Sequence, residues 1–354
     1  MRATSQTHRG AMSFAVVLVL ALCIGALPAF AAGYKATVLT ADQPGIGVFT
    51  DPNLQNPWGV SFAPAGDWWV SDNNSGLSTL YIDTGAPQSL VVTIPPAPGG
   101  TKGSPTGTVY NSTGDFKIFG FPAIFIFATE DGTISGWYTG TSATIGADES
   151  ASGANYKGLA IGNNGTGNFL YAANLFGASV DVFDKAYKLT TLSGTFHDPT
   201  LPRNFAPFNV HALNGSLYVL YAKQNASKKD AAFCAGCGLV DVYDMNGNIK
   251  KHLIKAGGKL NAPWGMALAP ANFGKFSKAL LIGNLGDGKI NAFNPSTGAF
   301  IGTLSDAANH PLVFSGLWEI FFGTGGVNGP TNTLFYSAGT GGYAHGQMGS
   351  VVAQ

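Results

Sequence analysis

Four oxygen-bearing side chains have the clearest capacity for chemistry, and each stands at the end of a short apolar run: Asp72, Glu130, Asn174 and Asn284. Carboxylate and amide oxygens are the ligands that Ca²⁺ prefers, and the ion takes six to eight of them. A convergence of the four would therefore make a calcium site. Asp and Asn at such positions are also common turn formers, because their side chains bond to nearby backbone N–H groups. The sequence leaves both interpretations open.

Three tryptophans in matching contexts form a second candidate set. Asn-Pro-Trp-Gly at 56–59 returns as Ala-Pro-Trp-Gly at 262–265, and Leu-Trp-Glu at 317–319 is a weaker copy. Trp58, Trp264 and Trp318 are therefore candidates to stack on a sugar or an aromatic ligand, with Lys223 as a further candidate contact. The alternative is structural, because large flat rings also bury much apolar area between neighbouring units.

The signals for catalysis are few. The sequence contains no Gly-x-Ser-x-Gly elbow and no His-Glu-x-x-His pair. The candidate catalytic residues are His345, in a glycine-rich loop, and Glu319, which stands where four other copies of the motif have glycine. The residues favour a protein that is not an enzyme.

These candidates lie on a repeated pattern, with a step of about 50 residues between copies. The position occupied by Trp58 recurs in six copies, as Trp58, Thr106, Lys157, Phe208, Trp264 and Trp318. Each copy continues into short runs of alternating, β-branched and aromatic residues bounded by Gly, Asn and Asp, which are strand signals. Six such units predict an all-β, six-bladed β-propeller with four-stranded blades.

The last copy ends at its third strand, so its outer strand is missing. The segment 34–40 (Tyr-Lys-Ala-Thr-Val-Leu-Thr) reads as a strand and is expected to fill that place, closing the ring. In a propeller, the loops before the innermost strands and those between the second and third strands share one face. The candidate residues above should gather on that top face, at the mouth of the central channel.

Composition agrees with this fold and excludes one class of partner. The 354 residues include 49 glycines and only 11% charged residues, a pattern typical of short strands and many turns. Lys+Arg and Asp+Glu are both 19, so the formal net charge is zero. A nucleic-acid-binding protein needs a basic field, and none is predicted.

The N-terminus has the pattern of a secretory signal peptide. Basic residues precede an apolar run at 14–27, and Ala-Phe-Ala-Ala follows at 29–32. Residues 1–32 are therefore predicted to be the signal peptide, and 33–354 a single propeller domain without a membrane span. Export to the periplasm or the cell exterior fits a disulfide between Cys234 and Cys237. We expect the exported protein to be a monomer.

The repeat unit resembles known propeller families. Pro-x-Gly-apolar starts, Asn/Asp-Gly turns and Val-Asp-Val-Phe-Asp at 180–184 resemble NHL-type repeats and gluconolactonase-like propellers. The whole segment after residue 32 resembles exported bacterial six-bladed propellers of unassigned function. Members of that family often carry a C-terminal sorting anchor, which we do not expect here. Gluconolactonase-like and paraoxonase-like propellers bind a divalent metal through Glu, Asn and Asp, so the resemblance implies Ca²⁺ as the cofactor of the four oxygen-bearing residues.

Three hypotheses for function follow, and one of them is a lyase of the antibiotic-cleaving propeller type, for which only His345 could supply the top-face histidine. The first is an exported binding module that presents its top face to a protein, a glycan or a small molecule. The alternative is a calcium-dependent lactonase or esterase with the metal at the central channel, where the ion would polarise a carbonyl group.

Overall fold

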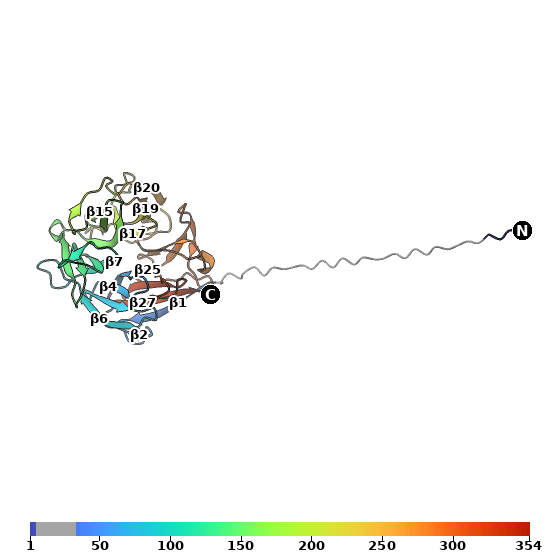
Figure 1. The fold of residues 1–354 in the computed structure, drawn as a ribbon, viewed down its shortest axis with the longest axis horizontal. Helices are drawn as coiled ribbons and strands as arrows, with labels where there is room; N and C mark the ends of the chain where they lie inside the picture. Colours follow the sequence, from blue (N-terminus) through green and yellow to red (C-terminus); the bar gives the residue numbers. More distant parts are fainter. Residues whose placement is uncertain (5–32) are drawn as a thin grey trace. The chain divides into compact units, whose positions relative to one another are not determined.

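The computed structural model describes residues 1–4 and 33–354. The predicted signal peptide, residues 1–32, lies almost wholly outside the described residues. From residue 33 onward the chain forms six sheets of four or five strands arranged in a ring, which confirms the six-bladed β-propeller (Figure 1). The blades are numbered 1 to 6 in the order in which their innermost strands occur in the sequence.

The innermost strand of each blade begins at the repeated motif. In blade order these strands are β3 (Pro57–Ser61), β7 (Pro105–Tyr110), β13 (Tyr156–Asn163), β17 (Phe205–Leu213), β21 (Pro263–Leu268) and β25 (Leu317–Phe322). The second strands are β4 (Trp68–Asp72), β10 (Phe125–Thr129), β14 (Asn168–Asn174), β18 (Ser216–Lys223), β22 (Leu280–Asn284) and β26 (Leu334–Thr340). Each innermost strand contacts those of both neighbouring blades, so together they line a central channel.

The third and outer strands complete the blades. The third strands are β5 (Leu77–Tyr81), β11 (Thr133–Trp137), β15 (Ser179–Phe183), β19 (Gly238–Tyr243), β23 (Ile290–Phe293) and β27 (His345–Ala353). The outer strands are β6 (Pro87–Thr93), β12 (Thr144–Asp148), β16 (Leu189–Thr190), β20 (Ile249–Ile254), β24 (Phe300–Thr303) and β1 (Tyr34–Ala41). Short additions are the pair β8 (Lys117–Ile118) and β9 (Phe121–Pro122), and the 3₁₀ turns Ser150–Ser152 and Gly274–Phe276.

The two ends of the propeller domain pair in blade 6. Strand β1 runs antiparallel to β27, from Tyr34 opposite Ala353 to Ala41 opposite Gln347 (Figure 1). The predicted closure by the segment 34–40 is therefore confirmed. Blade 6 differs from the expected four strands, because β2 (Phe49–Thr50) adds a fifth by pairing in parallel with β1.

The hydrophobic core is divided among the spaces between blades. Because successive side chains of a strand point to opposite faces of its sheet, each blade contributes to two cores. Trp68 packs against Phe335 of blade 6, whereas the next residue, Trp69, stacks on Phe125 of blade 2. The described residues form six such inter-blade clusters and a seventh at the centre of the ring.

Among the described residues, no helix has the length and apolar character required to cross a membrane.

Candidate functional site

A cavity of about 250 Å³ opens where the channel meets the top face, and we call it the mouth cavity. Its walls come from blades 1, 2, 4, 5 and 6, which bring loops and strand starts to this point. The lining residues used below are Trp58, Asn73, Glu130, Asp230, Phe233 and Tyr343. Aromatic and polar groups thus converge at the place where the repeats predicted a site.

A buried lysine organises the polar wall of the mouth cavity. Lys157, the second residue of β13, is fully buried, and its Nζ forms ion pairs with Glu130 and with Oδ1 of Asp230, the latter at 3.0 Å. The same Nζ lies 5.1 Å from the centre of the Trp58 ring. Asn73 donates a 3.0 Å hydrogen bond from Nδ2 to Oε2 of Glu130. Two carboxylates face one ammonium group, so this wall disfavours an anionic ligand.

The three motif tryptophans meet one another at the centre of the ring. Trp58, Trp264 and Trp318 are only 3%, 1% and 2% exposed, and Trp58 stacks on Trp318 with ring centres 3.5 Å apart. Trp318 donates from Nε1 to Asn56 at 3.0 Å, and Trp264 donates to the carbonyl of Lys157 at 3.2 Å. Among the described residues, the buried Nε1–H of Trp58 has no acceptor. Trp58 lines the mouth cavity, so its side chain combines contact with the cavity and an indole donor without a protein partner.

A long loop of blade 4, residues 224–237, forms the outer lip of the mouth cavity. It brings Asp230 to Lys157 of blade 3 and places Phe233, which is 51% exposed, at the opening. Cys234 and Cys237 are joined in a disulfide that ties the end of this loop. A second cavity of about 420 Å³ adjoins the first and shares Phe233 and Tyr343 with it. Together the two cavities make room for an extended ligand.

Sequence reasoning missed Asp230, Phe233 and Tyr343, and it gave Lys157 no role in a site. The loop 224–237 has no counterpart in the other copies, so comparison of the repeats gave no expectation for its residues. The length of this loop could have indicated a special role, because the spacing between second and third strands is longest in blade 4.

The four predicted calcium ligands make separate sets of hydrogen bonds. Asp72 accepts from the backbone and hydroxyl of Thr79, at 3.1 and 2.7 Å, and its burial raises its pKa well above the usual range. Asn174 accepts from the backbone N–H of Asn155 at 3.2 Å and donates to Asp181 at 2.9 Å. These are the turn-forming and strand-end contacts of the alternative interpretation.

Asn284 and Glu130, the other two predicted calcium ligands, also contact groups of the protein. Oδ1 of Asn284 accepts from the backbone of Asn261 at 3.1 Å, and its amide donates to the carbonyl of Lys259 at 2.9 Å. Of the predicted ligands only Glu130 lines the mouth cavity, and there Lys157 already supplies a positive charge. This arrangement fits a calcium ion poorly, because the ion needs six to eight available oxygens. The calcium site stays a prediction, and no chemical step is derived from it.

Two other predicted residues stand outside the lining of the mouth cavity. Lys223 is the last residue of β18, and His345 is the first residue of β27. Nδ1 of His345 lies 2.9 Å from Oδ2 of Asp42, and Nε2 lies 3.2 Å from the amide of Gln43. The imidazole is thus held by the segment that follows β1. A catalytic role for His345 stays a prediction.

Glu319 lies deeper in the channel, below the tryptophans. A second stretch of the channel, of about 330 Å³, is lined by the innermost strands and includes Glu319 and His211. Oε1 of Glu319 accepts from the backbone N–H of Ile320 at 3.0 Å, and burial raises its pKa to about 8. Burial lowers the pKa of His211 to about 4. Glu319 is therefore a perturbed acid inside the ring and not a residue of the mouth cavity.

The raised pKa of Glu319 predicts a particular dependence of stability on pH. A carboxyl group with a raised pKa holds its proton more tightly when folded, so the free energy of unfolding falls as the pH rises from 4.5 to about 8. This contribution amounts to at most about 1.4 kcal/mol per pH unit. We expect Glu319→Gln to gain stability relative to the wild type across this range, as measured by chemical denaturation at several pH values. A difference between the two proteins that stays constant with pH would contradict the assignment.

Comparison with known proteins supports the fold and shows the family. No family model matches the sequence. The aldose sugar dehydrogenase of Escherichia coli, solved in its apo form, has a TM-score of 0.54 at 13% identity, covering 91% of this chain and 100% of the dehydrogenase chain. A virginiamycin B lyase from Staphylococcus aureus has a TM-score of 0.52 at 13% identity, covering 86% of this chain and 83% of the lyase chain. At these identities the likeness is one of fold alone.

A relationship in sequence is found with a viral protein. The uncharacterised protein L690 of Acanthamoeba polyphaga mimivirus is 30% identical over 302 residues, which cover 81% of this chain and 78% of L690. Identity at this level over most of both chains indicates common descent. This chain, a six-bladed β-propeller, belongs to the same protein family as L690.

Proposed function

We propose that the chain is an exported binding module whose mouth cavity takes a neutral, polyhydroxylated ligand of the saccharide class. The observation that carries the proposal is the buried Nε1–H of Trp58, which has no acceptor among the described residues and belongs to a side chain that lines the cavity. A buried donor without a partner costs free energy, and a ligand oxygen would recover it.

The chemistry of the remaining wall supports a sugar in particular. Carboxylate oxygens of Glu130 and Asp230 accept hydrogen bonds from hydroxyl groups, and the amide of Asn73 can act as donor or acceptor. Phe233 and Tyr343 offer aromatic surface for the apolar face of a pyranose ring. An anionic ligand is disfavoured because two acids and one lysine leave the wall with excess negative charge, which is consistent with an uncharged sugar.

The N-terminal pattern and the disulfide support export. Residues 1–32 have the order of basic, apolar and small residues typical of a signal peptide. The Cys234–Cys237 disulfide fits export, because disulfides persist in oxidising compartments and are rare in the cytosol.

A glycan-array screen followed by calorimetry tests the binding function. We expect Phe233→Ala and Tyr343→Ala each to weaken binding of the best glycan about tenfold or more, a loss of about 1.4 kcal/mol. Phe119→Ala is the matched control, because Phe119 is an 86% exposed aromatic residue of blade 2 that lines neither cavity.

Two outcomes would count against the binding function. One is the absence of any glycan bound by the wild-type protein. The other is calcium-dependent turnover of a lactone or an ester, which would support the hydrolase alternative instead.

A further inference from the structure

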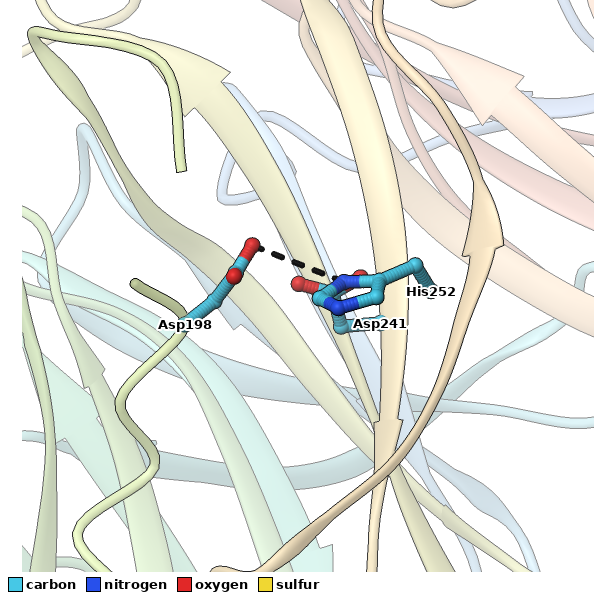
Figure 2. A group of neighbouring side chains, drawn as sticks. All are labelled: Asp198, Asp241 and His252. Atoms are coloured by element: carbon cyan, nitrogen blue, oxygen red, sulfur yellow. Dashed lines mark hydrogen bonds and ion pairs between the residues drawn. The ribbon is translucent and has the colours of Figure 1, made fainter. Parts of the chain in front are cut away.

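Two aspartates and a histidine converge at the outer edge of blade 4, on strands β19 and β20 and the loop before β17 (Figure 2). Asp241 on β19 stands directly opposite His252 on β20, and Asp198 comes from the connection between β16 and β17. Nδ1 of His252 lies 3.1 Å from Oδ1 of Asp241 and 3.6 Å from Oδ2 of Asp198. Each residue offers one potential metal-binding atom, and these three atoms all lie within 4.8 Å of one another.

The carboxylate oxygens of this cluster are not all satisfied. The side chains of Asp241 and Asp198 are only 2% and 3% exposed. Asp198 is fixed by Thr200, whose backbone N–H and hydroxyl both donate to Oδ1 at 2.7 Å, which leaves Oδ2 directed at the imidazole. Oδ2 of Asp241 is buried and has no hydrogen-bond partner among the described residues. A buried acceptor without a donor is costly, and a cation bound to this carboxylate would offset that cost.

When both carboxyl groups are ionised, the charges of the cluster do not balance. A protonated His252 would supply one positive charge against two buried carboxylates. Lys255 lines the adjoining cavity, but within the described part of the chain it forms no ion pair with Asp198 or Asp241. A divalent cation beside a neutral imidazole would balance both carboxylates.

We propose that Asp198, Asp241 and His252 bind a divalent transition-metal ion, for which Zn²⁺ is the reference. Two ligands of a tetrahedral ion with bonds of about 2.1 Å lie about 3.4 Å apart, and the observed separations of 3.1 and 3.6 Å bracket that value. The imidazole nitrogen favours a transition metal over Ca²⁺, which takes oxygen ligands. A cavity of about 370 Å³ adjoins the three residues and leaves room for water or a small molecule as the fourth ligand.

Calorimetric titration of the full chain with ZnCl₂ tests this site. We expect one Zn²⁺ to bind to the wild type, and we expect Asp241→Asn and His252→Gln each to weaken binding at least tenfold. His310→Gln is the matched control, because His310 pairs with a single carboxylate, Asp306, in an exposed setting. Its affinity for Zn²⁺ should equal that of the wild type. CaCl₂ should give much weaker binding than ZnCl₂.

A measurement on the wild type keeps the test independent of variant folding. One equivalent of Zn²⁺ should shift the NMR signals of the His252 imidazole and leave those of His310 in place. No Zn²⁺ binding, or binding that leaves the His252 signals unmoved, would overturn the proposal. So would folded Asp241→Asn and His252→Gln variants that bind Zn²⁺ as tightly as the wild type.

Discussion

Lys157→Met is expected to lower the free energy of unfolding by about 3 kcal/mol, because it removes the buried partner of two carboxylates. The effect arises mainly at Glu130, whose side chain is 25% exposed, whereas Asp230 is 61% exposed and can turn to solvent. Methionine keeps most of the volume of lysine, so a cavity contributes little to the loss. Equilibrium denaturation in urea measures the change.

A matched control and a second substitution separate charge from packing. Lys229→Met removes an exposed lysine of the loop 224–237, next to Asp230, and should change stability by less than about 0.5 kcal/mol. Adding Glu130→Gln to Lys157→Met should recover part of the lost stability, because the uncompensated carboxylate is then gone. A Lys157→Met protein as stable as the wild type would contradict the central role of this ion-pair network.

Gly59→Ala is expected to cost about 3 kcal/mol or more through a different mechanism, the close approach of innermost strands. A Cβ at Gly59 would lie 2.6 Å from the carbonyl oxygen of Thr106 and 3.1 Å from the backbone nitrogen of Thr108. Both contacts are with backbone of the neighbouring blade, which cannot move without opening the ring. Thermal or chemical unfolding measures the loss.

Gly114→Ala provides the comparison for this substitution. A Cβ at Gly114 would meet no atom within 4 Å, and its backbone does not require glycine. Its stability should therefore stay close to that of the wild type or rise slightly. Equal stability of the Gly59→Ala and Gly114→Ala proteins would show that the innermost strands do not need glycine to pack.

The same close approach explains why the repeats revealed the fold. Gly59, Gly107, Gly158 and Gly265 recur because innermost strands of adjacent blades touch at these points. The recurrence is a local pattern, so it can be read without the structure. The closing strand could likewise be inferred, because a last copy without its outer strand leaves an edge that only the N-terminal segment could fill.

The contacts that build the two candidate sites could not be read in this way. Lys157 and Asp230 are 73 residues apart, and Asp230 lies in a loop that occurs in one blade only. Asp198 also stands in a connection outside the repeated strands, although it lies beside His252. Repeat comparison predicts what the blades share, whereas these sites depend on what a single blade adds.

The hydrogen-bond partners of the three motif tryptophans also could not be predicted from the repeats. The equivalence of these tryptophans in the repeats correctly indicated that they lie at equivalent places. It gave no expectation of which acceptor, if any, each indole N–H would find. Trp264 and Trp318 donate within the protein, and Trp58 does not. The difference depends on the acceptors supplied by Lys157 and Asn56, which the pattern of aromatic residues does not specify.

The indole N–H signal of Trp58 in the NMR spectrum tests the binding site most directly. Trp58→Phe assigns the signal by its loss. Addition of the glycan selected on the array should shift the Trp58 signal and slow its exchange with solvent, while the signal of Trp68, which donates to the carbonyl of Asn328 at 3.0 Å, stays in place. Glycan binding that leaves the Trp58 signal unchanged would contradict the proposal that the mouth cavity is the ligand site.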